Sequence, residues 1–159
     1  MKHVTIQQAA EGIRESGIIA VARGRFEAAA LLDMAEILRQ AGITAMEVTL
    51  NSPDAPALIR RLADAMGARM LIGAGTVLTA EQAEAAVAAG AQFLVAPDFS
   101  PSVVEQARRA RVLHVPGVLS PTEVGQAAAA GCRLLKLFPA QTLGPDYLKA
   151  LRAPFDQLD

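Results

Sequence analysis

Cysteine and histidine, the residues that build disulfides and many metal sites, are almost absent from this chain of 159 residues. Cys132 is the only cysteine, which excludes an internal disulfide framework and a zinc site made of cysteines. The two histidines, His3 and His114, are too few to form a cluster that binds metal. We therefore expect no metal site.

Long apolar runs and clustered basic charge are absent too. No apolar run approaches the roughly twenty residues of a membrane span, and residues 1–17 have no apolar core followed by a cleavage signal. The fifteen lysines and arginines are scattered, and the formal net charge is -1, which excludes a polyanion-binding face. We expect a cytoplasmic protein that binds neither nucleic acid nor membrane.

Apolar residues make up 52% of the chain and follow a repeated pattern. Each repeat has an alanine-rich amphipathic helix, a small turn residue and a short apolar strand. Glycine stands where four of these helices need a left-handed residue at their C-terminus, at Gly42, Gly67, Gly90 and Gly131. The pattern predicts strands at residues 18–22, 44–50, 69–73, 92–96, 111–116 and 132–137.

Short apolar strands that alternate with helices form parallel sheets, either as doubly wound sheets or as (β/α)8 barrels. The stretch AVARGRFEAAALL, which contains the end of the first strand, lacks the G-x-G-x-x-G fingerprint of a doubly wound dinucleotide fold. The tight, even spacing of the repeats favours the barrel. Six β/α units are too few to close an eight-stranded barrel. We therefore expect an α/β protein with one (β/α)8 TIM-barrel domain over residues 1–159, truncated after the sixth β/α unit and lacking strands seven and eight.

Two charged residues, Lys136 and Glu47, stand within apolar strands. Because side chains alternate along a barrel strand, both fall on positions that face the interior. Apolar surroundings favour the neutral amine of a lysine, which can attack a ketone to form a Schiff base, and a nearby carboxylate can move the protons. The alternatives are a structural ion pair, or a lysine that extends to solvent at the barrel end. Side-chain alternation alone favours neither interpretation.

Further candidates stand near the ends of the expected strands. The hydroxyl of Thr76 could bind a substrate carboxylate or cap a helix, and Arg23 could pair with a carboxylate or phosphate or be merely solvated. Pro97 is expected to end a strand. His114 is more typical of a core histidine than of a catalyst, and Cys132 of a small packed residue.

Five segments occur in order and with suitable spacing: EVTLNSP, LIGAGTVL, FLVAPDFS, VPGVLSPTE and LLKLFPAQTLGPDYLKAL. Together they resemble the 2-keto-3-deoxy-6-phosphosugar-acid aldolases, and the resemblance covers nearly the whole chain. It implies a class I aldolase on a (β/α)8 barrel that needs no metal or other cofactor and is usually trimeric.

The resemblance also implies roles for single residues. Lys136 would form the Schiff base, and Glu47 would be the general acid and base. Four other residues would hold the substrate or line the pocket around its pyruvyl part: Arg23, Thr76, Pro97 and Phe138.

The substrate expectation depends on the residues after EVTL. Family members that act on the phosphogluconate-derived substrate commonly continue with Arg-Thr, whereas this chain has Asn51, Ser52 and Pro53. That pattern, with TLGPDYLKAL, is similar to the 6-phosphogalactonate branch. The resemblance thus implies cleavage of 2-dehydro-3-deoxy-6-phosphogalactonate to pyruvate and glyceraldehyde 3-phosphate, with Asn51 among the substrate-binding residues. The alternative substrate is 2-dehydro-3-deoxy-6-phosphogluconate or 4-hydroxy-2-oxoglutarate.

The family places a glycine-rich phosphate site on the seventh and eighth strands, which we do not find here. We therefore expect the 159-residue chain alone to have negligible aldolase activity, and a complete form to be a homotrimer. A function of another class, an inactive barrel fragment with a structural or interaction role, is the remaining alternative.

Overall fold

The computed structural model describes residues 4–159. Its helices are α1 (Ile6–Ser16), α2 (Ala28–Gln40), α3 (Ala55–Met66), α4 (Ala80–Ala88), α5 (Pro101–Ala110), α6 (Pro121–Ala129) and α7 (Gly144–Arg152). Its strands are β1 (Ile19–Ala22), β2 (Ala45–Thr49), β3 (Leu71–Gly75), β4 (Phe93–Val95), β5 (Leu113–Val115), β6 (Gly117–Val118) and β7 (Lys136–Leu137). None of the helices within residues 4–159 combines the length and the hydropathy needed to cross a membrane.

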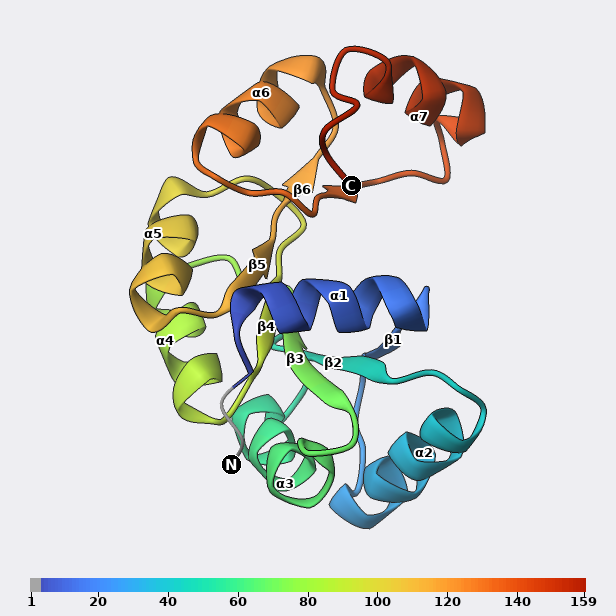
Figure 1. The fold of residues 1–159 in the computed structure, drawn as a ribbon. Coiled ribbons are helices and arrows are strands. Elements are labelled where there is room, and N and C mark those ends of the chain that lie inside the picture. The colour runs from blue at the N-terminus through green and yellow to red at the C-terminus, as the bar shows by residue number, and fades with distance from the viewer. Residues whose placement is uncertain (1–3) are drawn as a thin grey trace.

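Strands β1 to β5 form one parallel sheet in which the spatial order follows the chain order. A doubly wound sheet reverses its strand order at a switch point, whereas a barrel does not. Helices α2 to α7 form an arc around the strands, and α1 lies across the inside of that arc (Figure 1). The predicted barrel-type α/β fold is therefore confirmed.

The strand predicted at residues 111–116 continues as two strands, because Pro116 separates β5 from β6. Proline has no N–H to donate to a neighbouring strand, although its carbonyl still accepts a hydrogen bond from the Lys136 N–H at 2.9 Å. Strand β6 pairs with β7 in a separate two-stranded sheet, in which Gly117 lies opposite Lys136.

The strand predicted at residues 132–137 is too long. Only Lys136 and Leu137 form a strand, β7. The backbone before them bonds instead to the last residue of the chain: the Asp159 N–H donates to the Arg133 carbonyl at 3.0 Å, and the Leu135 N–H donates to the Asp159 carbonyl at 2.8 Å.

Apolar side chains pack on both faces of the large sheet. On the outer face, Met46, Val48 and Ile72 pack against buried residues of α2 and α3. On the inner face, α1 packs through Ala9, Ala10 and Ile13 against the first residues of several strands, among them Ile19, Ala45 and Leu71. Helix α1 therefore closes the end of the sheet at which the strands begin.

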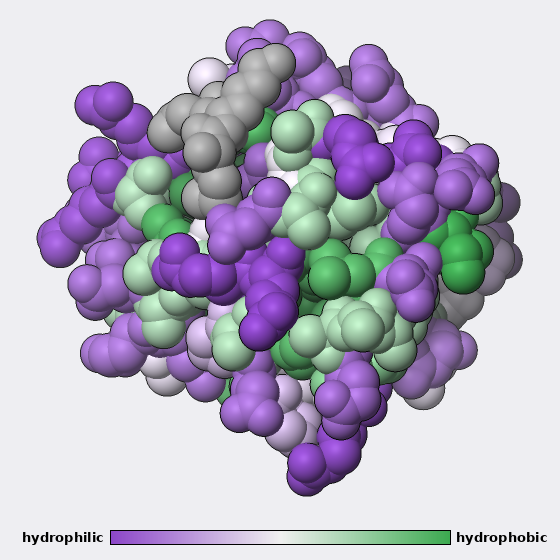
Figure 2. Space-filling model, turned by 90° about the horizontal axis from the view of Figure 1, so that it is seen from below, coloured by the Kyte–Doolittle hydropathy of each residue, from purple (hydrophilic) through white to green (hydrophobic). Residues whose placement is uncertain are grey.

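The outer surface is more polar. On the face seen from below Figure 1, hydrophilic side chains are spread widely and interrupt the apolar areas (Figure 2). This is the pattern expected of amphipathic helices that turn one side to the sheet and the other to solvent.

The turns that lead from helices into strands are mostly as predicted. Gly42, Gly90 and Gly131 have positive φ angles, whereas Gly67 does not: its φ is -60°. The prediction for Gly67 is wrong because the chain continues in a helix-like turn there, with Met70 N–H bonded to the Met66 carbonyl at 3.0 Å. After α5 the left-handed position is filled by Arg111, with φ 57°.

Candidate active site

The candidate residues gather where the strands of the two sheets end. Arg23 follows β1 directly, Thr76 follows β3, Pro97 comes two residues after β4, and Phe138 follows β7. Because the strands of each sheet are parallel, their carboxyl ends share one edge, which is where barrel enzymes place their active sites.

Glu47 lies in the middle of β2, between Val21 of β1 and Gly73 of β3, and is 3% exposed. Gly75 makes room for it, because a Cβ atom at that position would collide with the Glu47 carboxylate. Burial raises the pKa of Glu47 to about 7, while the charges of Lys136 and Arg23 act to lower it. A carboxyl group with this pKa can both donate and accept a proton near neutral pH.

Lys136 is half-buried on β7, and its Nζ atom lies 4.9 Å from the centroid of the Phe138 ring. That distance is within the range of a cation–π interaction. The ion pairs found among residues 4–159 do not join Lys136 to Glu47, although the charge of Lys136 acts on the Glu47 carboxyl. The structural ion pair therefore does not form, and the amine is left near a buried acid without a direct bond to it.

Arg23 and Thr76 approach each other from β1 and β3, with 3.5 Å between the guanidinium Nη2 and the threonine Oγ1. Thr76 has φ 58°, a left-handed conformation that β-branched residues rarely adopt. It is not the cap of the next helix, since Thr79 caps α4 by accepting a hydrogen bond from the Gln82 N–H. A guanidinium beside a hydroxyl is a suitable pair of donors for a carboxylate.

Pro97 and Gly117 connect the two sheets. A Cβ atom on Gly117 would collide with the backbone carbonyl of Pro97, and the Gly117 N–H donates to the Asp98 carbonyl at 3.1 Å. Because Gly117 also pairs with Lys136, this contact fixes the amine relative to the end of β4. Phe138, 40% exposed, lies beside the amine at the open edge.

Asn51, expected among the substrate-binding residues, is exposed in the turn after β2. The next residue, Ser52, is buried and bonds to the end of β1. Sequence reasoning missed Ser52, because a serine in a turn before proline is common and does not by itself indicate a buried hydroxyl.

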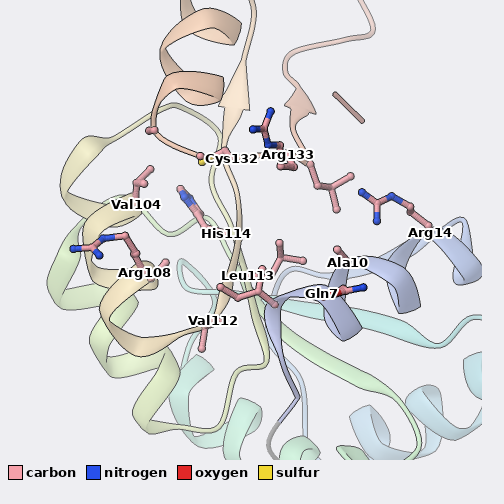
Figure 3. Close-up of a pocket in the computed structure, with 15 residues that line it drawn as sticks. Gln7, Ala10, Arg14, Val104, Arg108, Val112, Leu113, His114, Cys132 and Arg133 are labelled. Carbon is pink, nitrogen blue, oxygen red and sulfur yellow. The ribbon is translucent and has the colours of Figure 1, made fainter. Parts of the chain in front are cut away.

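A cavity with a volume of about 540 Å³ lies elsewhere, between α1, α5, β5 and residues 130–134 (Figure 3). None of the candidate catalytic or substrate-binding residues lines it. His114 borders this cavity, is 7% exposed and has no hydrogen-bond partner within residues 4–159 for either ring nitrogen. Burial lowers the pKa of His114 to about 4, so the ring is neutral at physiological pH.

Metal-ligating side chains do not gather in the part of the chain that the structure describes. Among residues 4–159, no group of three or more His, Cys, Asp or Glu side chains is placed to hold a metal ion. Cys132 packs with apolar residues of α6 and α7, and burial raises the pKa of its thiol.

The family model described as KDPG and KHG aldolase matches residues 9–159. The chain therefore belongs to the KDPG and KHG aldolase family. It is 44% identical over 116 residues to a probable 2-dehydro-3-deoxy-6-phosphogalactonate aldolase of Rhizobium meliloti (strain 1021), over 73% of this chain and 55% of the relative. It is 39% identical over 136 residues to the 2-dehydro-3-deoxy-6-phosphogalactonate aldolase of Escherichia coli (strain K12), over 86% of this chain and 66% of the relative.

A solved structure of similar fold is the KDPG aldolase of Legionella pneumophila, with pyruvate captured as a covalent carbinolamine intermediate. The TM-score is 0.86 and the identity 33%, over 93% of this chain and 71% of that one. The chain thus spans between about half and two thirds of the length of the two curated relatives it matches.

Proposed function

We propose that the protein is a class I aldolase that cleaves 2-dehydro-3-deoxy-6-phosphogalactonate to pyruvate and glyceraldehyde 3-phosphate. The observation that carries the proposal is the arrangement of Lys136 and Glu47: a half-buried amine near a buried carboxyl whose pKa is raised to about 7, with no ion pair between them. The galactonate and Legionella relatives support the same chemistry.

In the proposed reaction, the Lys136 amine adds to the C2 ketone of the substrate, giving a carbinolamine that loses water to form an iminium ion. Removal of the C4 hydroxyl proton then breaks the C3–C4 bond. The electron pair moves into the iminium to give an enamine, and glyceraldehyde 3-phosphate leaves. Protonation of the enamine at C3 and hydrolysis release pyruvate and free Lys136. Glu47 supplies and removes these protons, which its raised pKa favours.

The proposed substrate-binding groups lie at the carboxyl ends of the strands. The Arg23 guanidinium and the Thr76 hydroxyl, 3.5 Å apart, hold the carboxylate next to the ketone. Pro97 and Phe138 line the pyruvyl part, and Asn51 lies at the exposed side. The proposal includes a homotrimeric assembly in the cytoplasm, which rests on the family resemblance.

A second candidate substrate is 2-dehydro-3-deoxy-6-phosphogluconate, or 4-hydroxy-2-oxoglutarate. The family description, which includes both KDPG and KHG aldolases, and the Legionella KDPG aldolase support it. The two phosphorylated substrates differ in one hydroxyl at C4, beside the bond that breaks. The segment Asn51-Ser52-Pro53 and the two galactonate relatives favour the galactonate-derived substrate.

Reduction with borohydride in the presence of pyruvate tests the central step. We expect an irreversible adduct on Lys136, located by peptide mass spectrometry, and no adduct in Lys136→Arg. Lys149→Arg is the matched control, because Lys149 is exposed and pairs with Asp146 at 3.4 Å on α7. Glu47→Gln should retain the adduct but exchange the methyl protons of pyruvate with solvent deuterium roughly a hundredfold more slowly, the effect of losing the general acid and base that protonates the enamine.

Two results would contradict the proposal. An adduct on Lys149, or none in a folded protein, would remove Lys136 as the nucleophile. Near-normal exchange of the pyruvate methyl protons by Glu47→Gln would remove the carboxyl from the proton transfers and leave it a structural role.

A further inference from the structure

Two buried hydroxyl groups lie at the end of β2, next to the candidate site. Thr49 is 0% exposed and Ser52 is 6% exposed, and their oxygens are 3.0 Å apart. The Ser52 N–H donates to the Thr49 carbonyl at 2.9 Å, so a tight turn brings the second hydroxyl back over the first. Buried hydroxyls of this kind need partners, and both find them at the end of β1 and in the turn that follows it.

The partners are the backbone groups on either side of Arg23. The Gly24 N–H donates to Ser52 Oγ at 3.0 Å, and Thr49 Oγ1 donates to the Ala22 carbonyl at 3.4 Å. Since the Thr49 proton goes to Ala22, the Ser52 hydroxyl is the donor between the two side chains. One continuous chain of hydrogen bonds thus holds the residue before Arg23 and the residue after it.

Arg23 has little else to fix its direction. The residue is exposed, and its side-chain bond to Thr76 is long, at 3.5 Å. Gly24 has φ 131°, a conformation open to glycine and rarely to other residues, and its N–H donates to Ser52 Oγ in the turn after Arg23. Glu47 is two residues before Thr49 on the same strand, so one strand sets the positions of both the buried acid and the arginine.

We propose that Ser52 is a positioning residue that acts through Arg23, holding the guanidinium at the end of β1 where it binds the carboxylate of the keto acid. This inference rests on the proposed function, since it assumes that Arg23 binds substrate. In the segment Asn51-Ser52-Pro53, Ser52 faces inward and positions Arg23, whereas Asn51 faces solvent.

The test compares Ser52→Ala, Ser52→Thr and Ser16→Ala by the pyruvate concentration that gives half-maximal borohydride trapping on Lys136. Ser16 is the matched control. Its hydroxyl accepts a hydrogen bond from the Thr44 N–H at 3.1 Å and donates to the Ile18 carbonyl at 2.8 Å, so it connects the starts of β1 and β2. We expect Ser52→Ala to raise the half-saturating concentration about tenfold, the effect of losing one hydrogen bond that orients a charged group. Ser52→Thr, which keeps the hydroxyl, should have the half-saturating concentration of the wild type, and Ser16→Ala should leave that concentration unchanged.

A double variant separates positioning from simple destabilisation. In an Arg23→Ala background, Ser52→Ala should cause no further change in the half-saturating concentration, because a residue that acts through Arg23 has nothing left to position. A melting temperature lowered equally by Ser52→Ala and Ser16→Ala, with no change in pyruvate affinity, would overturn the inference alone. Failure to trap pyruvate on wild-type Lys136 would overturn the proposed function.

Discussion

The five-stranded sheet and the two-stranded sheet carry different parts of the candidate site, and the two sheets differ in how deeply their residues are buried. In the large sheet, β2, β4 and β5 are buried along their whole length, and Glu47 lies in β2, between β1 and β3, where it is 3% exposed. In the small sheet, both residues of β7 are half-buried, and Lys136 is one of them. The acid therefore lies in the more deeply buried part of the site and the amine in the more accessible part.

This division fits the chemistry. A proton-transfer group near neutral pKa is obtained by burying a carboxyl, and the large sheet does this to Glu47. A nucleophilic amine must meet a ketone from solution, and the small sheet leaves Lys136 half-exposed beside Phe138. The two halves meet through the close contact between Gly117 and the backbone of Pro97, so the comparison can be tested at each sheet and at their junction.

The largest effect is expected in the core of the large sheet, at Gly73. A Cβ atom there would collide with the ring of Phe93, which is 0% exposed and cannot move aside. Gly73→Ala should lower the free energy of unfolding by about 3 kcal/mol, the upper part of the usual range for overpacking. Urea denaturation of the variant and the wild type measures this change in the free energy of unfolding.

The control for that variant is Gly125→Ala in α6. Nothing lies within 4 Å of a Cβ atom at Gly125, so the alanine should stabilise the helix by about 0.5–1 kcal/mol. If Gly73→Ala were as stable as Gly125→Ala, the large sheet would not be the tightly packed region we describe.

A smaller effect is expected at the junction. In Gly117→Ala the new Cβ atom meets the backbone of Pro97, so β6 must shift, and Lys136 shifts with it because the two strands are paired. We expect trapping of pyruvate on Lys136 to slow about tenfold, which corresponds to about 1.4 kcal/mol. The loss of unfolding free energy should be smaller than in Gly73→Ala. An unchanged trapping rate in a destabilised protein would mean that the junction supports the fold without placing the amine.

Much of the large sheet follows from the sequence. Amphipathic helices that alternate with short apolar strands predict β1 to β5, the barrel resemblance and the even spacing of the repeats predict their order, and side-chain alternation places Glu47 inside. The small sheet was predicted less well. The apolar run at residues 132–137 predicts a strand there, but the local sequence indicates neither the break at Pro116 nor the hydrogen bonds of Arg133 and Leu135 to Asp159. Those depend on segments that meet only after folding.

The same limit explains what was missed at the site. Gly75 is small because Glu47 needs its space, and Ser52 is buried because β1 ends beside it. Neither reason is visible in the neighbouring sequence. That Lys136 acts on Glu47 without forming an ion pair with it is likewise a property of the folded chain.

The smallest net effect is expected in the wild type, where two buried groups of the large sheet titrate in opposite directions. Burial raises the pKa of Glu47 from about 4.5 to about 7, so its contribution to stability is lost as the pH rises through that interval. Burial lowers the pKa of His114 from about 6.5 to about 4, so its contribution is lost as the pH falls through that interval. Glu36 and Glu105, whose pKa values arginines lower to about 2, change stability only at lower pH.

Between pH 5 and 6.5 the two slopes should cancel, each being about 1.4 kcal/mol per pH unit for one proton. The wild type should therefore have nearly constant stability in urea across this range. In Glu47→Gln only His114 of the two groups still titrates, so the stability should fall as the pH is lowered. In His114→Phe only Glu47 of the two groups still titrates, so the stability should fall as the pH is raised. The stability of the double variant should again be constant across this range. If both single variants stayed flat, neither group would be buried as described, and the inside of the large sheet would be no drier than the small sheet that carries Lys136.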